Sequence, residues 1–111
     1  MVDRIPLWIR HEDRRRLREM RLYLSKTYAG ALRYVINGVE QSIGLYAVEW
    51  LFWTPWTEIP TIMLDHDTHA RLREICDWVG CRKTEAVASL IEAFDETFAI
   101  DYRSQYTDHI G

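Results

Sequence analysis

The side chains best suited to chemistry include a short cluster of histidines and acids. His66 and His69 lie three residues apart in the segment "DHDTH", and Cys76 follows further along. A zinc-type site brings three or four such ligands to one point, and this segment supplies too few at helical spacing. We therefore predict polar residues at a helix start here, and no metal site.

Catalytic constellations are not evident in the sequence. Serine and histidine are sparse and belong to predicted turns and helix starts, and no glycine-rich loop could cradle a phosphate. Two cysteines, Cys76 and Cys81, are too few for a disulfide framework and suit a reducing compartment. We predict a protein that is not an enzyme, needs no cofactor and does not enter a membrane. We expect it in the cytoplasm of a prokaryotic or virus-infected host cell.

Basic residues are concentrated in the first half of the chain. The net charge is −3, yet residues 1–45 hold nine Lys/Arg against five Asp/Glu, whereas residues 46–111 hold five against twelve. A polyanion should therefore meet mainly the first half. The run "DRRRLR" (13–18) has two readings: a nucleic-acid patch, or the solvated face of a helix on which Arg15 pairs with Glu19.

The elements that would position these residues occur twice. With an offset of 55 residues, the two halves share identities such as Arg16/Arg71 and Ala31/Ala86. The apolar pattern also recurs: Val87, Leu90, Ile91 and Phe94 match Leu32, Val35, Ile36 and Val39 at helical spacing. We infer a duplicated unit, and 111 residues suffice for one domain, 1–111, built from two copies.

Each unit begins with a short alternating run and continues with two helices. "RIPLWIR" and "PTIMLD" alternate with period two, which predicts a strand with one buried face. Asp65 is a candidate cap for the helix that follows, Gly80 a stop signal, and Thr27 and Thr84 candidate caps for the second helices. The predicted architecture is strand, helix, turn, helix, made twice.

This unit resembles the ribbon-helix-helix family of DNA-binding transcription regulators. The resemblance is carried by the segment "IMLDHDTHARLREICDWVGCRKTEAVASLIEAF", with its strand, capped helix, glycine turn and second helix "AVxxLIxxF". It covers about 35 residues in each copy, and the first copy fits in pattern only. It implies a mainly α fold with a two-stranded antiparallel β-ribbon, formed here by unit 1 (3–45) and unit 2 (59–100) as an intrachain pseudo-dimer. Two chains that pair like copies are the alternative.

The resemblance also implies a function and its residues. Such a protein is a sequence-specific regulator of transcription, here expected to be a viral or prokaryotic repressor, that inserts its ribbon into the major groove of double-stranded DNA. The residues carried over as base contacts are Arg4, Pro6, Trp8, Arg10, Thr61 and Met63. Those carried over as phosphate contacts, near the start of each second helix, are Lys26, Thr27, Tyr28, Cys81, Arg82, Lys83 and Thr84.

The connector between the units (46–58) is rich in aromatic residues. The rings either extend the preceding helix and cover the core, or form a patch for self-association or a protein partner; the candidates are Trp50, Phe52, Trp53 and Trp56. The last segment (101–111) lacks apolar periodicity and is predicted to be a tail, disordered or folded onto a partner. The alternative function is therefore a protein-binding module, antitoxin-like or an inhibitor of a host protein, that acts through this connector and the acidic second half.

Overall fold

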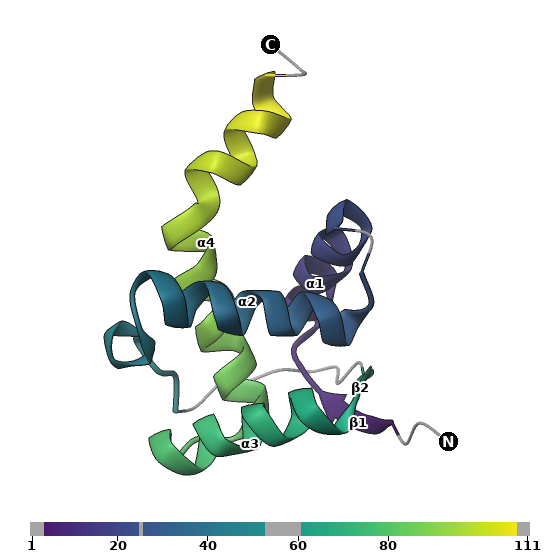
Figure 1. Cartoon of the computed structure of the whole chain (residues 1–111), viewed down its shortest axis with the longest axis vertical. Helices are drawn as coiled ribbons and strands as arrows, with labels where there is room; N and C mark the ends of the chain where they lie inside the picture. The colour runs from purple at the N-terminus through teal and green to yellow at the C-terminus, as the bar shows by residue number, and fades with distance from the viewer. Residues whose placement is uncertain (1–3, 25, 53–60, 109–111) are drawn as a thin grey trace.

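A computed structural model describes residues 4–24, 26–52 and 61–108 of the chain. Within these ranges the protein is mainly helical, with four α-helices and one sheet of two antiparallel strands (Figure 1). The elements follow in the order β1 (Ile5–Trp8), α1 (His11–Leu24), α2 (Tyr28–Ser42), a short 3-10 helix (Leu45–Ala47), β2 (Thr61–Leu64), α3 (His66–Val79) and α4 (Lys83–Asp108). The predicted combination of a helical fold and a two-stranded ribbon is confirmed.

Both predicted strands form, and they pair with each other. Leu7 lies opposite Ile62 in the register, and the two side chains are 3% and 2% exposed. The neighbouring pairs are Ile5 with Leu64, Pro6 with Met63, and Trp8 with Thr61. Pro6 has no N–H to donate, but a ribbon of two strands consists of edges only and tolerates it. The alternation in the sequence thus reflects one buried and one exposed face.

Three of the predicted helix signals act as expected. Thr27 caps α2 by accepting a hydrogen bond from the N–H of Gly30 at 3.0 Å. Asp65 caps α3 through the N–H of Thr68 at 3.4 Å. Gly80 ends α3 with φ of 85°, a left-handed conformation that glycine adopts without a steric cost. Capping residues that can be recognised in the sequence therefore set these helix boundaries.

Thr84 does not cap α4, contrary to the prediction. The helix begins at Lys83, and the carboxylate of Glu85 accepts a hydrogen bond from the N–H of Arg82 at 3.0 Å. This reaches back across the first turn as the glutamate of a capping box does. Burial opposes ionisation of Glu85, but the N–H and guanidinium of Arg82 hold its pKa below the usual value. An acidic residue in the first turn replaces the expected threonine cap.

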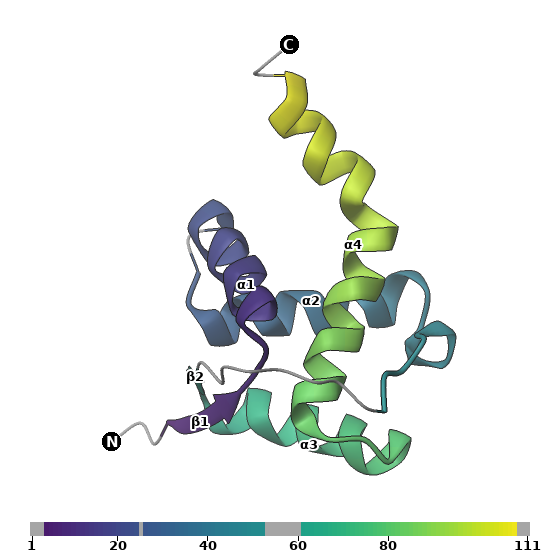
Figure 2. The same ribbon diagram turned by 180° about the vertical axis from the view of Figure 1, so that it is seen from behind.

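The hydrophobic core lies where α2 and α4 cross. α1 packs on α2 and α3 packs on α4 (Figures 1 and 2). The strands are exchanged between the halves, because β1 packs on α4 whereas β2 packs on α2. Equivalent positions of the repeat are buried alike, as Leu17 and Leu72 show at 0% exposure each. The two halves therefore share a single core.

A glycine allows the closest approach of α2 to α4. A methyl group added at Gly38 would lie 2.9 Å from Cε2 of Phe94. The ring of Phe94 is itself held in place, with its centroid 5.7 Å from that of Tyr34 and 4.7 Å from that of Phe98. The repeat-equivalent of Phe94 is the smaller Val39, so the large ring on α4 requires the missing side chain on α2.

The described part of the connector, residues 46–52, packs against the core without extending α2, which ends at Ser42. Val48 is buried, and the indole of Trp50 packs on the core and donates a hydrogen bond to the carbonyl of Leu45 at 3.3 Å. The N–H of Leu51 donates to Ser89 on α4 at 2.8 Å. The predicted extension of the helix is therefore wrong for the described part, whereas Trp50 covers the core as the same reading expected. Two further candidates, Trp53 and Trp56, lie outside the described residues.

The end of the chain also differs from the prediction. α4 continues to Asp108, through most of the segment predicted to be a tail, and its last turns reach away from the other helices (Figures 1 and 2). No proline or glycine interrupts residues 83–108. Apolar periodicity reports which face of a helix is buried, so its absence beyond residue 100 did not exclude a helix. Among the described helices, none is long and apolar enough to cross a membrane.

Candidate nucleic-acid interface

The outer side of the ribbon carries most of the residues predicted to contact bases. Its four paired positions point away from the core, and Trp8 and Met63 are 52% and 42% exposed. We call these four residues, Pro6, Trp8, Thr61 and Met63, the ribbon face. Arg4, just before β1, is exposed as well. Five of the six predicted residues therefore share one exposed surface.

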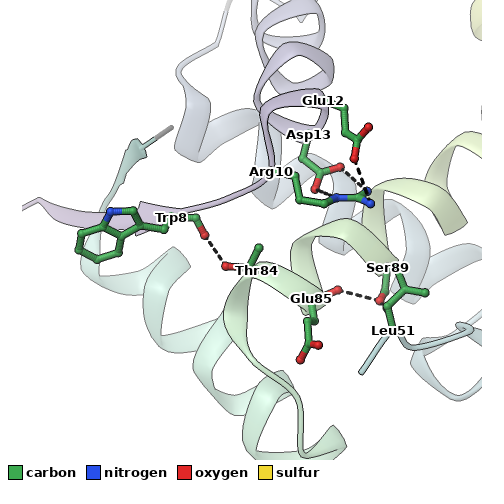
Figure 3. Close-up of polar contacts among 8 residues, drawn as sticks. All are labelled: Trp8, Arg10, Glu12, Asp13, Leu51, Thr84, Glu85 and Ser89. Carbon is green, nitrogen blue, oxygen red and sulfur yellow. Dashed lines mark hydrogen bonds and ion pairs between the residues drawn. The ribbon is translucent and has the colours of Figure 1, made fainter. Parts of the chain in front are cut away.

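Arg10 is placed differently from the other five. β1 ends at Trp8, and the chain then turns into α1, so that Arg10 no longer follows the alternation. Its Nε and Nη2 donate to the two oxygens of Asp13 at 2.7 and 2.9 Å, and Nη1 lies 3.1 Å from Glu12 (Figure 3). The hydrogen bond to Asp13 is the main cause of a raised pKa of Arg10. Asp13 is buried, so the guanidinium compensates a carboxylate that would otherwise be buried alone.

Thr84, predicted to contact phosphate, instead ties α4 to the ribbon. Its hydroxyl donates to the backbone carbonyl of Trp8 at 2.7 Å, and the residue is 8% exposed (Figure 3). The hydroxyl is thus committed to the ribbon rather than directed to solvent. The bond places the start of α4 beside the strand whose Trp8 ring points outward (Figure 3).

An open groove of about 380 Å³ is lined by β1, α3 and the start of α4. Cys81, Arg82 and Lys83, all predicted phosphate contacts, line it together with His69 and Arg73. Burial, followed by the charges of Lys83 and Arg73, lowers the pKa of His69. Arg73, Arg82 and Lys83 line the groove against one carboxylate, Asp77, and Glu85 offsets part of the charge of Arg82. The remaining positive charge favours an anionic ligand over a cationic one.

The thiol of Cys81 lies against that of Cys76 at the same end of α3. Burial raises the pKa of Cys76 to about 12, with Cys81 as the next cause, and burial raises the pKa of Cys81 as well. Both cysteines are free. A thiol that stays protonated is a weak nucleophile and carries no charge. Cys81 therefore contributes to the shape of the groove and not to its charge.

The start of α2 carries the remaining predicted phosphate contacts. Lys26 and Thr27 are exposed, although the hydroxyl of Thr27 serves as the helix cap. Tyr28 is half-buried beneath two guanidinium groups, those of Arg14 and Arg21, at 5.5 and 4.9 Å from its ring centroid. Lys26 is thus the charged residue that this end of α2 presents to solvent, while Tyr28 supports part of the basic surface of α1.

Arg16 and Arg71 were noted in the sequence as repeat identities, but not as the arginines that join the two halves. Arg16 on α1 donates to Asp95 on α4, with Nε 3.0 Å from Oδ2, and Arg71 on α3 forms an ion pair with Glu40 on α2. Each arginine also reaches an acid three residues ahead, Glu19 at 2.7 Å and Glu74 at 3.4 Å. The arginines are equivalent in the repeat, and so are the acids on the second helices. Acidic residues at matching offsets, Glu40 and Asp95, were a usable sequence signal.

A third link between the halves involves Arg33 of α2. Its Nη2 donates to Asp65 at 2.5 Å and to the hydroxyl of Thr68 at 2.8 Å, both at the start of α3. Hydrogen bonds from Thr68, and then the charge of Arg33, lower the pKa of Asp65. The residue that caps α3 is therefore also held by the other half of the protein.

An aromatic cluster lies apart from the ribbon, at the connector and the end of α3. The rings of Tyr46 and Trp78 meet edge to face with centroids 5.0 Å apart, and Trp50 meets Trp78 at 6.4 Å. Tyr46, Phe52 and Trp78 are 90%, 62% and 50% exposed. The sequence indicated Trp50 and Phe52 but not Trp78, which lies on the exposed side of α3.

No group of three or more potential metal ligands occurs within the part of the chain that the structure describes. The candidate site consists of an exposed ribbon, the groove beside it and the starts of two helices. Neither a protein-family model, nor a curated protein, nor a solved structure matches this chain.

Proposed function

We propose that this chain is a tandem ribbon-helix-helix protein that binds double-stranded DNA and regulates transcription, as a repressor. The ribbon face enters the major groove, which is wide enough for a two-stranded ribbon. The starts of α2 and α4 then meet the phosphates on either side. The protein would act where the DNA is, in the cytoplasm of a prokaryotic or virus-infected cell.

The observation that carries the proposal is the register of the ribbon. Leu7 and Ile62 are equivalent residues of the repeat, and they lie opposite each other. Pro6 is equivalent to Thr61 and Trp8 to Met63 in the repeat. The pair of Pro6 with Met63 is therefore equivalent to the pair of Thr61 with Trp8. A ribbon that maps onto itself in this way is what two copies related by a twofold axis would form, which supports an intrachain pseudo-dimer.

The polar links between the halves support the same arrangement. Arg16 reaches from α1 to α4, and its equivalent Arg71 reaches from α3 to α2. Each arginine therefore leaves its own unit and pairs with the second helix of the other unit. Such reciprocal contacts are characteristic of an interface between two copies of one fold.

A salt titration of DNA binding tests the proposal. Binding of a fluorescent duplex of random sequence is followed by anisotropy from about 50 to 300 mM salt. The logarithm of the binding constant should fall with the logarithm of the salt concentration with a slope of about −2 or steeper, because two helix starts each meet a phosphate. Lys26→Ala should reduce that slope by about 0.9. Arg18→Ala removes the same charge from an exposed site on α1, in the run 13–18. An unchanged slope in this variant assigns the run to the solvated face of the helix, whereas an equal reduction assigns it to the DNA-binding surface. No binding at low salt would refute the proposed function.

A second candidate function, a protein-binding module, is favoured by the aromatic cluster of Tyr46, Trp50 and Trp78. Exposed rings of this size are costly in water and are enriched in protein interfaces. Self-association through Trp50 and Phe52 is one form of it. Under this alternative, Trp78→Ala should abolish concentration-dependent association in sedimentation experiments, whereas Lys26→Ala should leave it unchanged.

A further inference from the structure

The ribbon face differs in chemistry from a surface suited to reading most bases. Its four side chains, defined above as Pro6, Trp8, Thr61 and Met63, include no charged group and no amide. The indole N–H of Trp8 and the hydroxyl of Thr61 are their only hydrogen-bond donors. The remaining surface of the face consists of hydrocarbon, sulfur and aromatic ring.

This composition limits which base edges the face can recognise. Guanine and adenine are distinguished in the major groove by paired hydrogen bonds from arginine, lysine, asparagine or glutamine. The ribbon face has none of these, and the guanidinium of Arg10 is bound by Asp13 through Nε and Nη2 and by Glu12 through Nη1. Arg4 precedes the paired region, so a guanine contact would be confined to one end of the ribbon. The centre of the ribbon has no side chain able to form such a bidentate pair.

The one feature of the major groove that an apolar side chain reads directly is the methyl group at C5 of a pyrimidine. Trp8 and Met63 hold equivalent positions in the repeat, lie on the same side of the ribbon, and are both about half exposed. The methyl group of Thr61, paired with Trp8, and the ring of Pro6, paired with Met63, complete an apolar surface. Cross-strand neighbours lie about 5 Å apart, so the four side chains form one continuous patch.

We propose that the ribbon face recognises pyrimidine C5-methyl groups in duplex DNA, with Trp8 and Met63 as the two specificity-determining residues. The inference rests on the DNA-binding function proposed above and names the feature of the DNA that it reads. The same chemistry is offered by thymine and by 5-methylcytosine. Enclosing one methyl group is worth about a fourfold change in affinity, so two enclosed groups give more than tenfold.

The test compares duplexes that differ only in these methyl groups. A duplex is first selected from a random pool by the intact chain, and its affinity is measured by fluorescence anisotropy. A second duplex carries deoxyuridine in place of every thymidine in the bound site, which removes the methyl groups and leaves base pairing unchanged. A third is the thymidine duplex with 5-methylcytosine in place of cytosine within the bound site, and its affinity is compared with that of the thymidine duplex.

We expect the deoxyuridine duplex to bind at least fourfold more weakly than the thymidine duplex. Tighter binding of the 5-methylcytosine duplex would identify modified cytosine as a ligand alongside thymine; unchanged binding would restrict recognition to thymine. Met63→Gln keeps the length of the side chain but not its apolar character, and should reduce the thymidine preference. Arg18→Ala should weaken both duplexes equally or not at all, because Arg18 lies on α1.

The outcomes separate this inference from the proposed function. Equal binding of the thymidine and deoxyuridine duplexes would overturn methyl recognition and leave DNA binding in place. A thymidine preference that persists in Met63→Gln and in Trp8→Gln would overturn the assignment to the ribbon face. Failure to bind any duplex at low salt would refute the proposed function, and this inference with it.

Discussion

Replacing Gly38 with alanine tests how closely the two halves are fitted together. The added methyl group would lie 2.9 Å from Cε2 and 3.2 Å from Cδ2 of Phe94, well inside the ordinary carbon–carbon contact distance of about 3.5–4.0 Å. Overpacking of this kind costs about 1–3 kcal/mol, while alanine gains about 1 kcal/mol over glycine inside a helix. We expect a net loss of about 1 kcal/mol in the free energy of unfolding.

The sign of the effect should reverse when the ring is removed. A Phe94→Val background removes the two closest contacts and leaves Cε2 of Phe98 at 3.4 Å, an ordinary contact distance, so Gly38→Ala should instead stabilise the protein by about 1 kcal/mol. The two effects differ by about 2 kcal/mol, which is the coupling between the two positions. Urea unfolding of the four proteins, followed by circular dichroism, measures all of these free energies.

Gly30→Ala is a suitable control because Gly30 lies in the same helix but not beside Phe94. A methyl group there would approach Cβ of Lys26 at 3.1 Å and Oγ1 of Thr27 at 3.4 Å. Its effect should therefore be the same with and without Phe94→Val. If Gly38→Ala stabilised the wild-type protein, or acted equally in both backgrounds, the contact between Gly38 and Phe94 would not determine how α2 approaches α4.

Three further predictions concern the links between the halves and the interior. Arg16→Gln should lower the free energy of unfolding more than Arg71→Gln in urea titrations, both within about 0.2–1 kcal/mol, because Arg16 is 25% and Arg71 37% exposed. Asp65→Ala should lower the free energy of unfolding by about 1 kcal/mol at pH 7. Because the pKa of Asp65 is lowered in the folded state, this difference from wild type should be complete above about pH 4 and vanish as the pH falls through the lowered pKa. Thermal unfolding measured over a range of acidic pH values would show it. Iodoacetamide at pH 8 should leave Cys76 unmodified in the folded protein but label it in urea, as detected by mass spectrometry, because burial raises its pKa to about 12.

The features that the sequence predicted well are those governed by neighbouring residues. Period-two alternation indicated both strands because one face of each is buried, and Thr27, Asp65 and Gly80 acted as boundaries because capping depends on the first or last turn alone. The exposed positions of the ribbon followed from the same alternation. These are short-range relations, and a single sequence contains them completely.

The features that were missed depend on residues far away in the chain. Thr84 looked like a cap, but its hydroxyl bonds to Trp8, which precedes it by 76 residues. Arg10 looked like a continuation of the strand, but the chain turns after Trp8, and the buried carboxylate of Asp13 takes its guanidinium. In each case a polar group satisfied a partner that only the folded chain brings within reach. Predicted contacts at the margin of an element are therefore the least secure part of such a site.

The unequal lengths of α2 and α4 give the molecule a direction. α2 stops at Ser42, whereas α4, its counterpart, continues to Asp108 and reaches beyond the rest of the fold. An assembly of two identical chains would carry such an arm on both sides and look the same after half a rotation. Here the arm emerges from one side only, so the two ends of the molecule differ in shape even where the repeat makes the ribbon and the core alike.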